Sequence, residues 1–139
     1  MTQSIIEVMT PNPVSLPAAS PLQEAARCMK ERDIGDVIVL DNGTVCGVVT
    51  DRDIVVRAVA ENRDPATTKL GDICSRDLAT LTPADSVEDA IELMRERAIR
   101  RVPIIDNGAP VGIVSIGDLA VDRDPQSALA DISSAAPND

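Results

Sequence analysis

Two short stretches of the sequence combine a hydroxyl and a carboxylate at the same spacing. The first contains Thr50, Asp51, Arg52 and Asp53, and the second contains Ser115, Gly117 and Asp118. In each, an apolar run is expected to end as a strand at the hydroxyl, and the last aspartate falls in the first turn of a helix. Such a pair could belong to a catalytic site, a ligand site or a simple helix cap. For a single pair of this kind a helix cap is the more common role, so the rest of the sequence must decide between a cap and a functional site.

The composition excludes several classes of function. The chain of 139 residues contains no histidine, which excludes imidazole-based metal ligation and histidine-dependent acid–base catalysis. It contains no Phe, Tyr or Trp, so a site that stacks bases on aromatic rings is also excluded. A formal net charge of −10 argues against a nucleic-acid surface and against docking on anionic lipid. Without a Walker or Rossmann glycine pattern, we do not expect an enzyme.

The cysteines and the hydropathy suggest a cytoplasmic protein. The three cysteines, Cys28, Cys46 and Cys74, have no Cys-x-x-Cys spacing, and we interpret them as buried, reduced thiols. The sequence has no run of 18 apolar residues and no charged-then-apolar leader, so we expect neither a membrane span nor secretion.

The two stretches are part of a repeat with an offset of 65 residues. Shifted by that offset, the Asp-Asn-Gly of residues 41–43 falls on that of residues 106–108, and Gly47 falls on Gly112. We therefore predict a duplicated unit. The predicted boundaries are residues 5–62 for the first repeat, 63–68 for a linker, 69–123 for the second repeat and 124–139 for a short helix and tail.

Each repeat is predicted to form a β-α-β-β-α unit. We expect a capping box at the start of each first helix, from Ser20 and Gln23 in the first repeat and from Asp85 and Glu88 in the second. The apolar residues of both helices follow the i, i+3, i+4, i+7 spacing that buries one face. They are Leu22, Ala25, Ala26 and Met29, and Val87, Ala90, Ile91 and Met94.

A β-hairpin is expected after each of these helices. An Asn-Gly pair between two apolar runs predicts the hairpin turn, because both residues tolerate positive φ. A second helix should run from Asp53 to about Glu61 and from Asp118 to about Asp122. Neither repeat alone has enough apolar surface for stability. The predicted fold is therefore α/β (α+β), with two repeats sharing a core around a pseudo-twofold axis.

The duplicated pattern resembles the CBS-domain family, and in particular a stand-alone tandem pair, the Bateman module. The resemblance rests on the lead-in Val8-Met9-Thr10, on the hairpins with their Asp-Asn-Gly turns, and on the Gly-x-x-Thr/Ser-x-x-Asp endings. It covers residues 5–121, and small actinobacterial members are the most similar. It implies a regulatory, adenosine-type ligand, such as AMP, ADP, ATP or S-adenosylmethionine, in a cleft between the repeats, with no obligatory cofactor and no metal.

Carried onto this chain, the resemblance implies two pseudo-symmetric ligand sites. The first, here called the Asp118 site, would comprise Ser15, Ile34, Gly35, Asp36, Arg101, Ser115, Gly117 and Asp118. Asp118 would accept the ribose hydroxyls, and a helix N-terminus would face the phosphate. Ile34 would pack on adenine, backbone groups near Asp36 would read the edge of the base, and Arg101 matches a phosphate-contacting position of the family.

The second, here called the Asp53 site, is expected to differ. It would comprise Thr50, Arg52, Asp53, Thr80, Ile99, Arg100 and Arg101. In this site Asp36 takes the place that Arg101 has in the other, so a phosphorylated ligand would meet a like charge. We expect this site to be empty, weaker, or compensated by Arg52.

The leading functional hypothesis is a non-catalytic sensor that acts in trans on an unidentified protein partner. The resemblance also implies a homodimer, and neither nucleic acid nor membrane is expected as a partner. The alternative is a ligand-free, dimeric interaction protein with vestigial clefts. Binding of adenosine-type compounds would distinguish the two.

Overall fold

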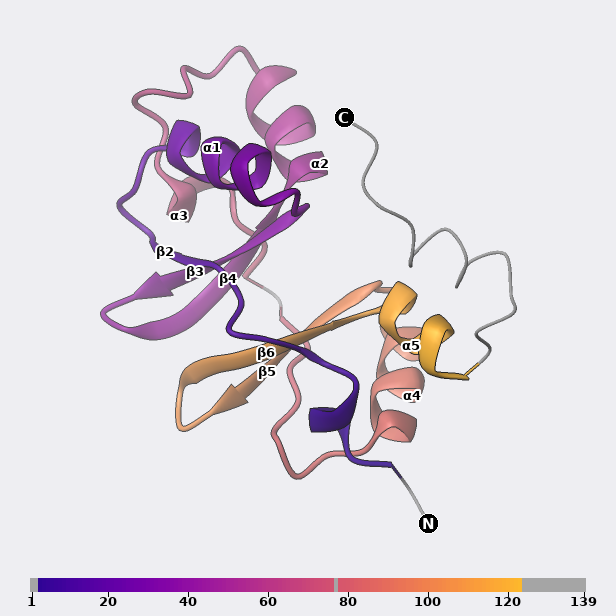
Figure 1. Ribbon diagram of the computed structural model, residues 1–139. Helices are drawn as coiled ribbons and strands as arrows, with labels where there is room; N and C mark the ends of the chain where they lie inside the picture. The colour runs from indigo at the N-terminus through magenta and orange to yellow at the C-terminus, as the bar shows by residue number, and fades with distance from the viewer. Residues whose placement is uncertain (1–2, 77, 124–139) are drawn as a thin grey trace. The chain divides into compact units, whose positions relative to one another are not determined.

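The fold consists of two compact units that do not coincide with the two sequence repeats. A computed structural model describes residues 3–76 and 78–123 (Figure 1). The first unit comprises residues 13–76 and 78, and the second comprises residues 3–12 and 79–123. Each repeat therefore places its own lead-in segment in the unit built mainly from the other repeat.

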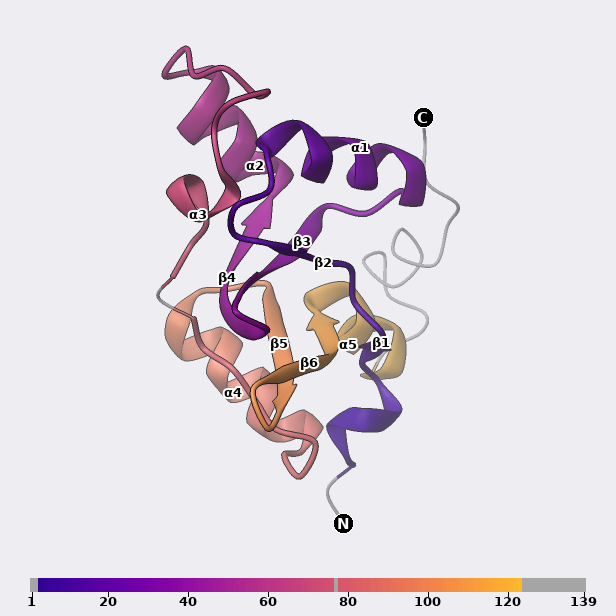
Figure 2. The same ribbon diagram turned by 90° about the vertical axis from the view of Figure 1, so that its left-hand side faces the viewer.

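The first unit is a three-stranded sheet with helices on one side. Its strands are β2 (Ser15–Pro17), β3 (Asp36–Asp41) and β4 (Thr44–Thr50), in the order β2-β3-β4. Strand β2 runs parallel to β3, and β4 is antiparallel to it. The helices are α1 (Leu22–Arg32), α2 (Asp51–Asp53), η2 (Ile54–Val59) and α3 (Leu70–Ile73). Helices α1 and α2 lie on the same side of the sheet (Figure 2).

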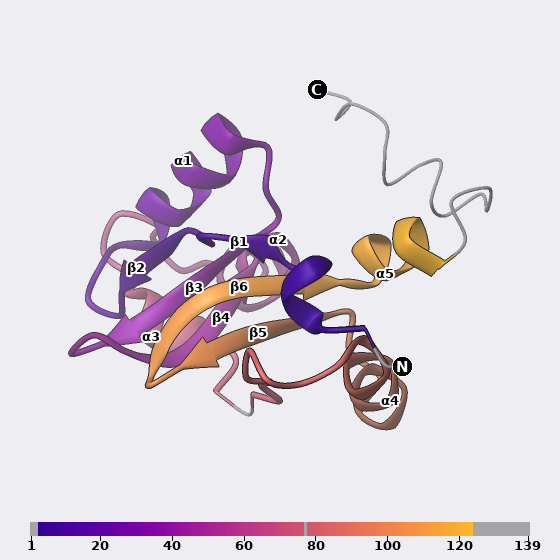
Figure 3. The same cartoon turned by 60° about the horizontal axis from the view of Figure 1, so that its bottom comes forward.

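The second unit repeats this plan with a different third strand. Its sheet has the order β1-β6-β5, from β1 (Thr10–Pro11), β5 (Arg101–Asp106) and β6 (Ala109–Ser115). The helices are η1 (Ile5–Glu7), α4 (Val87–Arg97) and α5 (Ile116–Arg123). The N-terminal segment lies beside the β5–β6 hairpin, where β1 pairs with β6 (Figure 3). The predicted counterpart of β2 is reduced to a single bridge between Leu81 and Ile104.

Aliphatic side chains fill both cores, as the absence of aromatic residues requires. In β3, the consecutive residues Val37, Ile38 and Val39 are all fully buried, which confirms a strand covered on both faces. Both hairpin turns are confirmed too. Asn42 and Asn107 each have a φ of 52°, and the glycines that follow them have a φ of 80° and 82°. The mixed α/β fold class is therefore confirmed.

The capping boxes predicted for the first helices are wrong. At α4 the box is formed one residue later, by Ser86 and Asp89, because Asp85 accepts hydrogen bonds from Thr82 in the preceding turn. At α1 the N-cap is Pro21 and no side chain caps the helix. Instead, the N–H groups of Leu22 and Gln23 donate to the carbonyls of Thr68 and Pro65 in the inter-repeat segment, at 2.8 and 3.0 Å.

The second helices begin earlier than predicted. Because Thr50 is the N-cap residue, α2 starts at Asp51, and α5 correspondingly starts at Ile116. In the first unit the helix then widens into the π-helix η2, for which the sequence carries no signal. The short helix expected after Asp124 lies outside the described residues.

The exchanged lead-in segments pack directly on two glycines of the hairpins. A Cβ added to Gly47 would lie 2.6 Å from the Cys74 sulfur and 2.8 Å from the Ser75 carbonyl oxygen. A Cβ added to Gly112 would overlap the side chain of Met9. The absence of a side chain at both positions lets the exchanged segment approach the sheet closely, through backbone and side chain at Gly47 and through the Met9 side chain at Gly112.

Candidate functional site

Each hydroxyl–aspartate pair forms a reciprocal capping box at the end of a hairpin. In the first unit the Thr50 N–H donates to Asp53 Oδ2 at 3.0 Å, and the Asp53 N–H donates to Thr50 Oγ1 at 3.1 Å. In the second, Ser115 and Asp118 make the same two hydrogen bonds at 3.0 and 3.1 Å. The cap interpretation is therefore correct locally, and it uses one carboxylate oxygen of each aspartate.

The second oxygen of Asp53 is already engaged. Arg57 Nε lies 3.7 Å from Asp53 Oδ1, and the Asp53 side chain is only 14% exposed. Arg57 also donates from Nη1 to the carbonyl of Ile73 at 2.9 Å. These contacts tie α2 to α3 within the first unit, so Asp53 has a structural role that is independent of any ligand.

Asp118 differs from Asp53 in this respect. Its Oδ2 accepts the Ser115 N–H, but within residues 3–76 and 78–123 no partner is found for Oδ1. The residue is half-buried at the start of α5. A carboxylate oxygen in that position can accept a hydrogen bond from a ligand hydroxyl without breaking an existing contact.

The N–H groups of the first helical turn show the same difference. In the first unit the Arg52 N–H donates to the side chain of Asp51 at 2.8 Å. The corresponding N–H in the second unit is that of Gly117, and the preceding residue there is Ile116, which cannot accept it. Gly117 is too near the helix start for an intrahelical acceptor, and it finds none in the described part of the chain.

Oppositely charged residues lie across from the two hydroxyls. Asp36 is the register partner of Thr50, and Arg101 is the register partner of Ser115. The residue before each is also held there, because the Gly35 carbonyl accepts the N–H of Asp51 at 3.0 Å and the Arg100 carbonyl accepts that of Ile116 at 2.9 Å. The predicted contrast between Asp36 and Arg101 is therefore built into the same position of the two hairpins.

The remaining predicted residues lie near these two hairpin ends. Ser15 is half-buried in β2, opposite Ile38, whereas Thr80 is exposed just before the Leu81 bridge. Ile34 and Ile99 are half-buried and pack against the core of their own unit. Each predicted site thus takes some of its residues from the first unit and the others from the second. Both complete sites draw on both units, so their assembly stays a prediction.

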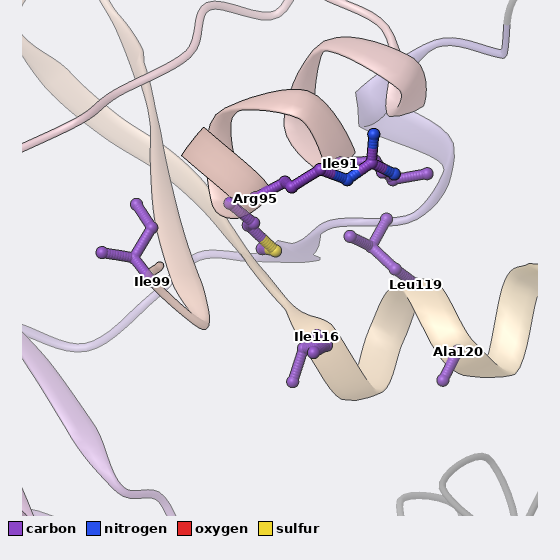
Figure 4. Close-up of a pocket in the computed structure, with 7 residues that line it drawn as sticks. Ile91, Arg95, Ile99, Ile116, Leu119 and Ala120 are labelled. Carbon is purple, nitrogen blue, oxygen red and sulfur yellow. The ribbon is translucent and has the colours of Figure 1, made fainter. Parts of the chain in front are cut away.

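A pocket of about 350 Å³ that the sequence did not indicate opens between α4 and α5 (Figure 4). It contains Ile99 of the predicted Asp53 site and Ile116 of the Ser115–Asp118 turn. Its other lining residues are Ile91, Met94, Arg95, Leu119 and Ala120. The helical spacing of Ile91 and Met94 indicated a buried face of α4, but not that a pocket remains there between the described residues of α4 and α5.

Comparison with known proteins decides the family. A family model described as "CBS domain" matches residues 5–59 and 70–121. The chain belongs to the CBS-domain family. It is 39% identical over 134 residues to the CBS domain-containing protein YhcV of Bacillus subtilis, covering 94% of this chain and 95% of that protein. It is 35% identical over 100 residues to Hypoxic response protein 1 of Mycobacterium tuberculosis, covering 71% and 70%.

Solved CBS-domain structures show the same fold. Hypoxic Response Protein I, crystallised with two coordinated zinc ions, superposes with a TM-score of 0.76 at 29% identity, over 86% of this chain and 98% of that one. The hexameric CBS-CP12 protein from bloom-forming cyanobacteria gives a TM-score of 0.78 at 29% identity, over 90% and 74%. Tandem CBS pairs are typically regulatory and non-catalytic, and some of these structural neighbours are oligomeric.

Two further observations concern metals and membranes. Among residues 3–76 and 78–123, no group of three or more Cys, Asp or Glu side chains is arranged to hold a metal ion. Within the same ranges, no helix combines the length and the apolar character that crossing a membrane requires.

Proposed function

We propose that this tandem CBS pair is a cytoplasmic, non-catalytic sensor of an adenosine-type ligand, and that it regulates a partner protein in trans. The observation that carries the proposal is a pair of groups at the start of α5, the Gly117 N–H and Asp118 Oδ1, which are open in the sense that they have no partner among residues 3–76 and 78–123. A donor and a charged acceptor side by side suit a ligand that has both phosphate and ribose groups.

The residues of the second unit suggest how such a ligand is held. Asp118 Oδ1 accepts a ribose hydroxyl while Oδ2 keeps its capping hydrogen bond. The Gly117 N–H, at the positive end of α5, and the guanidinium of Arg101 attract the phosphate. Because Gly117 has no side chain, the phosphate can approach its backbone closely. The chain has no aromatic residue, so adenine must lie between aliphatic side chains.

We propose that the two sites are not equivalent. In the first unit the groups that correspond to this donor and acceptor are occupied, by the side chains of Asp51 and Arg57. Asp36 adds a negative charge opposite Thr50. A phosphorylated ligand in the Asp53 site must therefore break existing contacts and approach a carboxylate, so that site should remain empty or bind weakly.

Isothermal titration calorimetry with AMP, ADP, ATP, NAD and S-adenosylmethionine tests the proposal. We expect one tightly bound ligand per chain and a preference for phosphorylated compounds over S-adenosylmethionine. A bound ligand should stabilise the fold by about 2.7 kcal/mol at a hundredfold excess over its dissociation constant. If no adenosine compound binds, the ligand-free interaction protein becomes the better explanation.

The second part of the proposal is a homodimer. Val55, Val56 and Val59 on η2 are 57%, 47% and 66% exposed, and they form an apolar patch on an otherwise strongly acidic protein. We propose that a second copy of this chain covers this valine patch, because burying three adjacent valines is favourable and a like copy supplies a matching surface.

Replacing Val59 by aspartate should dissociate this dimer. The side chain is 66% exposed, so the fold should tolerate the change, whereas a charge buried in the interface should not be tolerated. Sedimentation velocity should show a dimer for the wild type and a monomer for Val59→Asp. Ile6→Asp, at an exposed isoleucine outside the patch, is the matched control and should stay dimeric. A monomeric wild type would contradict the proposal.

A further inference from the structure

Cys46 occupies a special position in the first hairpin. In the β3–β4 ladder Val39 pairs with Gly47 and Leu40 pairs with Val45, so Cys46 is the extra residue of a β-bulge. A bulge changes the direction in which a side chain leaves its strand. The neighbouring Gly47 is the residue on which Cys74 packs, so the bulge and the packing site of the second thiol are adjacent.

Cys74 lies against this bulge from the exchanged lead-in segment. It is the residue after α3, its sulfur would lie 2.6 Å from a Cβ at Gly47, and the next residue, Ser75, forms a bridge with Val48 of β4. Burial raises the pKa of the Cys74 thiol, the nearby Arg76 guanidinium offsets part of this rise, and the neighbouring Cys46 side chain raises the pKa further. Cys46 packs against the same core cluster that contains Cys74, so the two thiols are neighbours in the fold although they are distant in sequence.

The second unit has two apolar residues at the positions equivalent to Cys46 and Cys74. There the bulged residue of β6 is Val111, and the side chain that packs on the hairpin glycine is Met9. Val111 and Met9 both pack against the second core. The first unit thus has a pair of thiols where the repeat otherwise carries two apolar side chains, so packing does not require cysteine at either position.

We propose that Cys46 and Cys74 form a reversible disulfide, a redox-controlled link between β4 and the segment that follows α3. The oxidant is hydrogen peroxide. The Cys46 thiolate attacks one peroxide oxygen and breaks the O–O bond, which gives a sulfenic acid and releases water with the proton of the thiol. The Cys74 sulfur then attacks the Cys46 sulfur, the S–S bond forms and the S–O bond breaks, and the departing hydroxide leaves with the proton of the Cys74 thiol as a second water.

The structure assigns different roles to the two sulfurs. Cys46 is half-buried, so a small peroxide can reach it. Cys74 is only 8% exposed, and its thiol donates a hydrogen bond to the Gly71 carbonyl at 3.9 Å. Because the thiolate is the reactive form and burial disfavours it, Cys74 is suited to be the resolving thiol. Formation of this disulfide does not depend on nucleotide binding.

Peptide mapping after peroxide treatment of the full chain tests this assignment. Trypsin should release Cys46 in the peptide of residues 33–52 and Cys74 in that of residues 70–76, because Arg32, Arg52, Lys69 and Arg76 flank them. We expect a cross-link between these two peptides that dithiothreitol reverses. We expect it to form at least about tenfold faster in the folded protein than in urea, because the fold holds the thiols in contact.

Variants that copy the second unit separate the role of each thiol from folding. Cys46→Val and Cys74→Met place the residues of the equivalent apolar pair, so both should fold, and both should lose the cross-link. In the Cys46→Val variant, peroxide should leave Cys74 largely unoxidised. The Cys28→Ser variant is the control for the third cysteine and should still form the cross-link. The proposal is wrong if both thiols remain alkylatable after oxidation, if Cys28 is the main partner, or if the cross-link forms equally fast in urea.

Discussion

Asp118→Ala is expected to weaken binding of the adenosine-type ligand by about tenfold to a hundredfold, because a hydrogen bond to a charged group contributes about 1.5–3 kcal/mol. Asp118 Oδ1 is the open acceptor at the start of α5, and the ribose hydroxyl loses its partner when the carboxylate is removed. Titration calorimetry on the purified variant measures the change in affinity directly.

The substitution also removes a helix cap, so a control must separate stability from binding. Asp89 forms the same reciprocal capping box with Ser86 at α4, outside the predicted site. Asp89→Ala should therefore cost a similar capping energy, about 1 kcal/mol, and leave ligand affinity unchanged. Asp53→Ala should leave the high-affinity site intact. Equal loss of affinity in Asp118→Ala and Asp89→Ala would show that Asp118 acts only through the stability of its helix.

Gly47→Ala is expected to lower the free energy of unfolding by about 1–3 kcal/mol, the usual cost of overpacking a well-filled region. The new Cβ would lie 2.8 Å from the Ser75 carbonyl oxygen, which belongs to the backbone and is held by its bridge to Val48. This overlap can be relieved only if the exchanged segment moves away from β4. Urea unfolding should be followed by circular dichroism, because the chain has no aromatic residue to report by fluorescence.

The equivalent glycine of the second unit is the matched control. At Gly112 the three atoms nearest to an added Cβ all belong to the side chain of Met9, which has several rotatable bonds and can move aside. Gly112→Ala should therefore be less destabilising than Gly47→Ala, and the alanine offsets part of its cost by reducing the freedom of the unfolded chain. If Gly112→Ala proves equally costly, then the backbone contact at Gly47 is not what limits packing there.

The sequence determined those features that depend on local pattern and on duplication. The Asn-Gly pairs specify both hairpin turns because few residues adopt positive φ, and the apolar runs specify buried strands. The repeat was visible because the residues of each hairpin recur at one offset. The contrast between Asp36 and Arg101 was also readable, since a register partner in a hairpin follows from the turn.

Only the tertiary structure decided which segments pack together and which polar groups remain open. The pattern of a lead-in segment is the same whichever sheet it joins, so neither the exchange nor the proximity of Cys46 to Cys74 could be foreseen. The capping of α1 depends on carbonyls far along the chain, which no local motif encodes. Asp53 and Asp118 end the same motif, although the residue four positions later is Arg57 in one repeat and Asp122 in the other. Only the structure shows that Arg57 reaches Asp53 Oδ1, because hydrogen-bond satisfaction is a property of three-dimensional contacts.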